Sequence, residues 1–67
     1  MSKSTIERLI YMANQIAANL ATSDDPVSAT AAHIERYWDP RMKAMIKAYT
    51  GNDLTPAAAG AIGRITA

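Results

Sequence analysis

Apolar residues recur three and four positions apart along most of the chain, which is the spacing of one face of an α-helix. The longest run follows this spacing through residues 5–21, with polar residues on the other faces. It consists of Ile6, Leu9, Ile10, Ala13, Ile16, Ala17 and Leu20. The same spacing returns in residues 26–37 and in residues 40–50. The pattern therefore predicts three amphipathic helices over these ranges.

Helix-start signals stand before the predicted helices. Ser4 with Glu7 has the form of a capping box. Three further pairs place a good N-cap before a proline at the first helical position, where the missing N–H costs nothing. These pairs are Asp25-Pro26, Asp39-Pro40 and Thr55-Pro56. Gly51 is the expected C-terminal stop of the third helix.

The last of these pairs opens a fourth segment, over residues 56–65, which we expect to be a weaker helix. Gly60 and Gly63 each cost about 1 kcal/mol relative to alanine inside a helix. We therefore predict an all-α fold, a small bundle of three helices plus a weaker C-terminal fourth helix. A chain of 67 residues makes one domain, here residues 1–67.

The core that such a chain can form is small. A domain of this size buries only about 60% of the surface that its unfolded form exposes, so its stability is marginal. Apolar residues make up 49% of the chain, but many are alanines, which bury little area. The large core candidates are Ile6, Leu9, Ile10, Met12, Ile16, Leu20, Val27, Ile34, Trp38, Met42, Met45, Ile46, Ile62 and Ile65. We therefore expect a protein partner to supply additional stability.

Composition also limits the chemistry and the location of the protein. With no cysteine and one histidine, the chain has neither disulfides nor the ligands of a zinc or iron–sulfur site. The net charge of +1 gives no bias toward nucleic acids or anionic membranes. The sequence shows no secretory segment, and no apolar stretch approaches the ~20 residues of a membrane span. We expect a cytoplasmic protein with no nucleic-acid or membrane partner.

No residue pattern in the sequence indicates catalysis. His33 is the first candidate for a general base, but Glu35 and Arg36 beside it in sequence do not make a triad. A histidine on a helix surface or at an interface is the favoured interpretation. Asp24 and Asp25 are explained by a helix start. We therefore expect no catalytic residue, no metal site and no bound cofactor in this chain.

The segment from Trp38 to Lys43 places two cationic residues at an unfavourable position of a predicted helix. Arg41 and Lys43 fall in the first turn of a predicted helix, where the helix dipole disfavours positive charge by about 0.3–1 kcal/mol at exposed sites. Two interpretations remain open. Arg41 pairs within the chain, with Glu35, Asp39 or Asp24, or it reaches a carboxylate on another protein or a bound anion.

Several polar and large side chains are candidates for a docking face. Asn14 and Gln15 stand within a strongly apolar helix, where the spacing favours side chains that face water over hydrogen bonds across an interface. The large side chains exceed what one small core can hold; they are Tyr11, Met12, Tyr37, Trp38 and Tyr49. Aromatic residues, Met and Arg are enriched at interfaces, so we expect some of them on a docking face.

Two blocks of sequence resemble a known family. One is Arg-Leu-Ile-Tyr-Met-Ala-Asn-Gln-Ile-Ala at residues 8–17, and the other is His33-Ile34 followed by Trp-Asp-Pro-Arg-Met at residues 38–42. With these blocks, the chain resembles the delta subunit of cytosolic, NAD-dependent formate dehydrogenases that contain molybdenum or tungsten. The resemblance covers roughly residues 6–46 and is loose after Gly51.

The resemblance implies a non-catalytic accessory subunit of a formate dehydrogenase complex. It implies binding to the catalytic alpha subunit, with a role in assembly, cofactor maturation or stability. The other subunits are expected to carry the bis-pterin molybdenum or tungsten cofactor, iron–sulfur clusters, FMN and the NAD site. The docking residues that the resemblance and the surplus of large side chains together predict are Tyr11, Met12, Asn14, Gln15, His33, Tyr37, Trp38, Asp39, Pro40, Arg41, Met42 and Lys43.

Two other functions stay open at the level of sequence. One is a self-associating helical protein, in which the same apolar faces form a homodimer. The other is a small nucleic-acid-binding module built on Arg36, Arg41, Lys43 and Lys47. The small net charge is evidence against the second, because such modules usually show a larger positive field.

Overall fold

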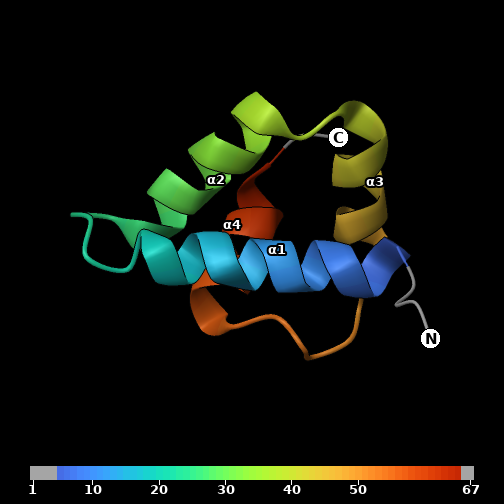
Figure 1. Ribbon diagram of the computed structural model, residues 1–67, viewed down its shortest axis with the longest axis horizontal. Coiled ribbons are helices and arrows are strands. Elements are labelled where there is room, and N and C mark those ends of the chain that lie inside the picture. Colours follow the sequence, from blue (N-terminus) through green and yellow to red (C-terminus); the bar gives the residue numbers. More distant parts are fainter. Residues whose placement is uncertain (1–4, 66–67) are drawn as a thin grey trace.

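The computed structural model describes residues 5–65, which contain four α-helices and no strands (Figure 1). They are α1 (Thr5–Asn19), α2 (Pro26–Tyr37), α3 (Pro40–Ala48) and α4 (Pro56–Arg64). The predicted all-α class is confirmed. None of the four reaches the length and hydrophobicity that a membrane crossing requires.

The helices begin where the sequence places them, because each N-cap side chain performs the expected hydrogen bond. Carboxylate oxygens of Asp25 and Asp39 accept the backbone N–H groups of Ser28 at 3.2 Å and Met42 at 2.8 Å. The hydroxyl of Thr55 accepts the N–H of Ala58 at 3.3 Å. A proline follows each cap at the first helical position. The predicted capping box cannot be described, since Ser4 lies outside the described residues.

Three of the predicted helix ends differ from the structure by one or two residues. Helix α1 ends at Asn19 instead of residue 21, and the hydroxyl of Ser23 donates to the Leu20 carbonyl at 2.7 Å in the turn that follows. Helix α3 ends at Ala48 instead of residue 50, because Tyr49 is already extended. Gly51 has no left-handed backbone, so the prediction that it stops the helix is wrong. Helix α4 ends one residue earlier than predicted, at Arg64.

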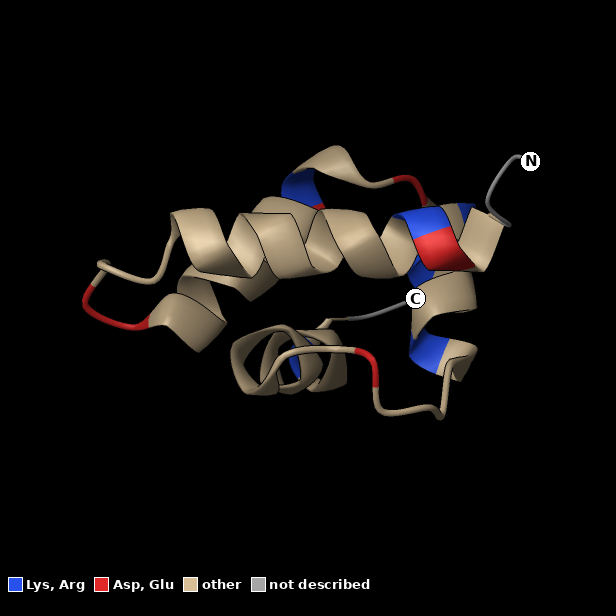
Figure 2. Cartoon of the chain, turned by 60° about the horizontal axis from the view of Figure 1, so that its bottom comes forward, with Lys and Arg blue, Asp and Glu red and all other residues tan. Residues whose placement is uncertain are grey.

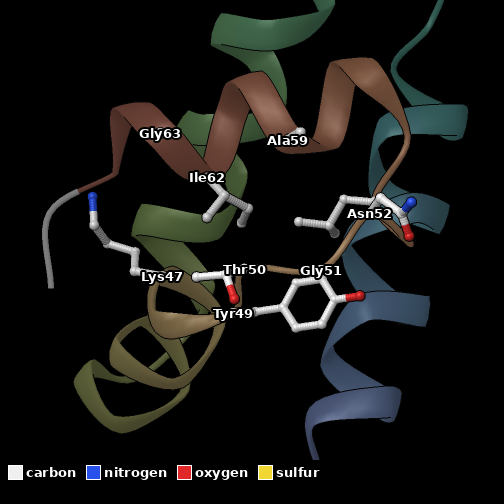
Figure 3. A pocket seen from close by; sticks show the side chains of 9 residues that line it. Lys47, Tyr49, Thr50, Gly51, Asn52, Ala59, Ile62 and Gly63 are labelled. Carbon is white, nitrogen blue, oxygen red and sulfur yellow. The ribbon is translucent and has the colours of Figure 1, made fainter.

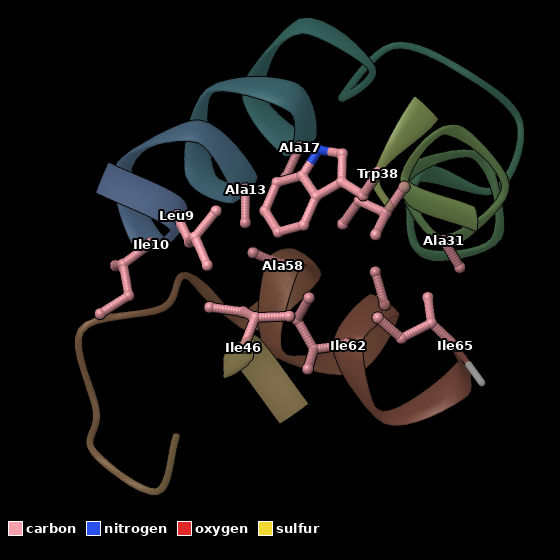
Figure 4. Packing of buried hydrophobic residues seen from close by; sticks show 12 residues of the cluster. Leu9, Ile10, Ala13, Ala17, Ala31, Trp38, Ile46, Ala58, Ile62 and Ile65 are labelled. Carbon is pink, nitrogen blue, oxygen red and sulfur yellow. The ribbon is translucent and has the colours of Figure 1, made fainter. Parts of the chain in front are cut away.

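The core is built from large side chains set among alanines (Figure 4). Ile34 and Ile46 are fully buried, and Trp38 is 5% exposed. The indole of Trp38 lies among Ala13, Ala17 and Ala58, whose small side chains leave room for one large ring (Figure 4). The alanines therefore shape the core, although each buries little area itself. Of the large core candidates, Met12 is the one that the structure exposes.

Helix α4 is an integral part of this core. It packs against α1, α2 and α3, and it buries Ala58, Ala61 and Ile62, followed by Ile65. Gly60 allows its close approach to α2, because a Cβ atom at this position would lie 3.3 Å from a Val27 methyl group. The helix is nine residues long, as is α3. The fourth helix therefore packs against the other three helices of the same chain.

The two glycines of α4 give a test of what limits its stability. A Cβ atom at Gly63 would meet no atom within 4 Å, so Gly63→Ala adds helix propensity without a clash. We expect it to raise the free energy of unfolding by about 0.5–1 kcal/mol, or roughly 2–8 °C in Tm. Gly60→Ala is the matched control, and should gain less because Val27 must yield. Thermal unfolding followed by circular dichroism measures both, and an equal gain in the two variants would contradict this account.

Candidate partner-binding surface

Two groups of predicted docking residues lie on the surface. The first, which we call the α1 patch, consists of Tyr11, Met12 and Gln15 on one face of α1. Tyr11 is 56% exposed and Met12 39%. The side-chain amide of Gln15 donates to the Tyr11 hydroxyl at 3.1 Å, which fixes the two side chains relative to each other. Figure 2 shows that long stretches of α1 carry no charged residue.

The second group, which we call the corner patch, lies where α2 ends and α3 begins. It consists of four predicted docking residues, His33, Tyr37, Pro40 and Arg41, and of Arg36, which the sequence did not predict as a docking residue. All five are exposed. Tyr37 is 66% exposed. Its ring centroid lies 4.7 Å from that of His33 and 5.8 Å from the guanidinium carbon of Arg36. The corner patch thus combines aromatic and cationic side chains that already contact one another.

Arg41 has no hydrogen bond or ion pair with any residue in the described range. Two of its three expected partners form other contacts. Glu35 pairs with Lys43, whose ammonium lies 3.0 Å from a carboxylate oxygen. The Asp39 carboxylate accepts the N–H of Met42. Asp24, the third, lies in the turn before α2 and forms no ion pair with Arg41. Within residues 5–65, the structure therefore does not show the pairing of Arg41 inside the chain that the first interpretation expected.

Other predicted docking residues serve the fold of the chain itself. Trp38 fills the core, so its indole is not on the surface. Asp39 caps α3, Met42 is half-buried against the core, and Lys43 is held by Glu35. Trp38 and Lys43 were predicted to face another protein. The prediction did not consider that the core of the chain takes up Trp38 and that Glu35 pairs with Lys43.

Asn14 differs most from the prediction. Its side-chain amide donates to the Asp53 carbonyl at 3.0 Å, and its side-chain oxygen accepts the N–H of Thr55 at 2.9 Å. It therefore ties the loop before α4 to α1 and does not simply face water, as the spacing favoured. Gln15, the next residue, is exposed as the spacing indicated. No local signal could have separated the two, because the partners of Asn14 are 39 and 41 residues away.

A pocket of about 580 Å³ lies between the α3–α4 loop and α4 (Figure 3). Leu54, Ala59 and Ile62 form its apolar wall. Lys47 is its one charged lining residue, and the ammonium group of Lys47 donates to the Ile65 carbonyl. The other polar side chains that line it are Tyr49, Thr50 and Asn52. Within residues 5–65, no group of three or more acidic or histidine side chains is placed to hold a metal ion.

Two side chains have shifted pKa values, and local hydrogen bonds explain both. The Ser28 hydroxyl, and after it the Ser28 N–H, lowers the pKa of Asp25 below its ordinary 3.8. The hydrogen bond between the Tyr49 hydroxyl and the Asp53 carboxylate raises the pKa of Tyr49 above 10.0. One shift belongs to a helix cap and the other to a loop contact. Neither side chain is part of the α1 patch or the corner patch.

The chain matches one known protein family. The family described as NADH-dependent formate dehydrogenase delta subunit FdsD matches residues 8–62. This range contains both sequence blocks described above and continues past Gly51 to Ile62 in α4, further than the resemblance noted from the sequence. No curated protein and no solved structure matches the chain.

Proposed function

The chain belongs to the family of NADH-dependent formate dehydrogenase delta subunits, and we propose that it is a non-catalytic subunit that docks onto the catalytic alpha subunit of such an enzyme. The match over residues 8–62 carries this proposal. In it, docking supports assembly of the complex, maturation of its cofactor, or its stability. The protein would act in the cytoplasm.

The residues of the family-like blocks fall into two sets, and the second set supports a docking role. Asn14, Trp38 and Asp39 are used inside the chain, to tie a loop, fill the core and cap a helix. Met12, Gln15, His33 and Arg41 are exposed, and the fold does not need them for packing. Large exposed side chains such as Tyr11 and Tyr37 beside Arg are typical of binding hot spots. The α1 patch and the corner patch are therefore the proposed docking surfaces.

The residues of the chain do not fit direct binding of the redox groups of a formate dehydrogenase. The chain has no cysteine to hold an iron–sulfur cluster, and the ring of its one histidine packs against Tyr37 in a tilted arrangement. In this proposal the bis-pterin molybdenum or tungsten cofactor, the iron–sulfur clusters, FMN and NAD are bound by the other subunits. This chain contributes a docking surface to the complex and binds none of these groups itself.

Two experiments test the proposal, co-purification with a tagged chain and removal of the chain from the producing cell. In the first, we expect the tagged chain to purify with the catalytic subunit of formate dehydrogenase. We expect the enzyme from cells without the chain to lose most of its formate-dependent NAD reduction. Metal content per catalytic subunit then separates a role in maturation, where it falls, from a role in stability, where less protein is recovered. Unchanged activity and unchanged yield without the chain would contradict both roles.

A further inference from the structure

We propose that the corner patch binds an acidic segment of the catalytic subunit, with Arg41 and Arg36 as its carboxylate-binding residues. This inference rests on the proposed function and specifies its partner chemistry. The α2–α3 linker, which carries the corner patch, lies away from the α3–α4 loop in Figure 1. The proposal therefore concerns a surface separate from the pocket in Figure 3.

The first argument is the unbalanced charge of Arg41. It is exposed in the first turn of α3, where the positive end of the helix dipole disfavours a cation. It gains nothing in exchange within residues 5–65, since Glu35 and Asp39 have other partners. A carboxylate from another protein would offset this cost. A planar guanidinium group also suits such a partner, because it can donate two parallel hydrogen bonds to one carboxylate.

The second argument is the ordered aromatic platform beside it. The ring of Tyr37 lies near the ring of His33, at 4.7 Å, and near the guanidinium group of Arg36, at 5.8 Å, although two thirds of its surface is exposed. These contacts restrict the side chains before any partner binds, which reduces the entropy that binding costs. Tyr and Arg are also the residue types that contribute most at hot spots.

The third argument is the rigid base under the patch. Arg36 and Arg41 are five residues apart, so their Cα atoms lie within roughly 18 Å of each other. Between them Trp38 is anchored in the core, and its N–H donates to the Ile34 carbonyl at 2.9 Å. The cap of Asp39 fixes the start of α3. One short segment of a partner can therefore span both arginines.

The charge of the corner favours a protein carboxylate over a polyanion. Asp39 lies between Arg36 and Arg41 in sequence, and Lys43 is neutralised by Glu35. Two arginines that form no ion pair within residues 5–65, with an aspartate between them, give a small local field, whereas nucleic-acid surfaces need several unpaired cations. The structure thus assigns the corner to an acidic protein segment.

A zero-length cross-link tests the chemistry of the partner directly. Carbodiimide joins a lysine amine to a carboxyl group as an amide, with loss of water, and it does not couple arginine. Arg41→Lys in the assembled formate dehydrogenase complex should give a new cross-link to an Asp or Glu of the catalytic subunit, identified by mass spectrometry. Arg64→Lys at the end of α4 is the matched control, since Arg64 is also exposed and lies outside the α1 patch and the corner patch. Absence of any cross-link from Lys at position 41 to a carboxylate of that subunit would overturn the inference.

Binding measurements give the second test. The complex purified from cells without the chain is titrated with the full chain and with Arg41→Ala, Arg36→Ala and Arg64→Ala. We expect about tenfold weaker binding or more for the first two, and no change for Arg64→Ala, because Arg64 lies at the end of α4, outside both patches. Arg41→Ala with wild-type affinity, or an equal loss for Arg64→Ala, would overturn the assignment to the corner while leaving the proposed function in place. Failure of the wild-type chain to bind would instead overturn the proposed function, and this inference with it.

Discussion

Trp38→Ala is expected to leave most of the chain unfolded at room temperature. Trp38 is 5% exposed and fills the space that Ala13, Ala17 and Ala58 leave in the core (Figure 4). Truncation of a buried Trp costs about 3–5 kcal/mol, because it removes buried apolar area and leaves a cavity. A domain below ~70 residues rarely has more than 3–5 kcal/mol in total. The expected loss is therefore as large as the whole stability.

Circular dichroism at 222 nm and urea titration measure this effect. The matched control is Tyr37→Ala, the neighbouring aromatic residue, whose ring is mostly exposed. We expect Tyr37→Ala to change the free energy of unfolding by less than about 0.5 kcal/mol, as is usual for surface substitutions. If Trp38→Ala kept a cooperative transition with the wild-type midpoint, Trp38 would not be the central core residue that the structure shows.

Asn14→Ala is expected to lower the free energy of unfolding by about 1–2 kcal/mol, or roughly 4–16 °C in Tm. Its side chain makes two hydrogen bonds to the loop before α4, to the Asp53 carbonyl and the Thr55 N–H. Their loss frees the segment that caps α4, so part of the effect is local. Amide hydrogen exchange at Thr55 should therefore become faster in the variant than exchange in α2.

Two variants bracket this prediction. Gln15→Ala removes one exposed hydrogen bond, to Tyr11, and should be nearly neutral. Asn14→Asp keeps the acceptor for the Thr55 N–H but replaces the donor to the Asp53 carbonyl with an oxygen, so it should fall between wild type and Asn14→Ala. Equal stability of Asn14→Ala and Gln15→Ala would show that water replaces the Asn14 contacts without loss.

The blocks that resemble the family contain both residues that support the fold and residues that are free to contact a partner. Asn14 and Trp38 contribute to the fold, whereas Gln15 and Arg41 are exposed beside them. A substitution at Trp38 would abolish partner binding through unfolding, and this result would say nothing about the interface. Arg41→Ala avoids the ambiguity, because Arg41 supports no contact in the described part of the chain. Interface experiments should therefore start at the corner patch.

The sequence by itself determined the helices and their starting points. Asp25, Asp39 and Thr55 each accept a hydrogen bond from an N–H three residues later, so cap and helix are encoded by neighbouring residues. The 3.6-residue period likewise depends on positions within two turns of each other. The helix ends were less well predicted, since Tyr49 leaves α3 without the left-handed glycine expected at Gly51.

Only the tertiary structure decided which side chains of those helices serve the core and which remain free. Trp38 turns inward because alanines of α1 and α4 together leave a space, and that space exists only when both helices are packed. Asn14 binds a loop 39 and 41 residues away, and the position of that loop depends on how α4 packs against α1. Within residues 5–65, Glu35 pairs with Lys43 and no ion pair forms at Arg41. Contacts over such distances depend on the arrangement of whole helices, which no local pattern in the sequence specifies.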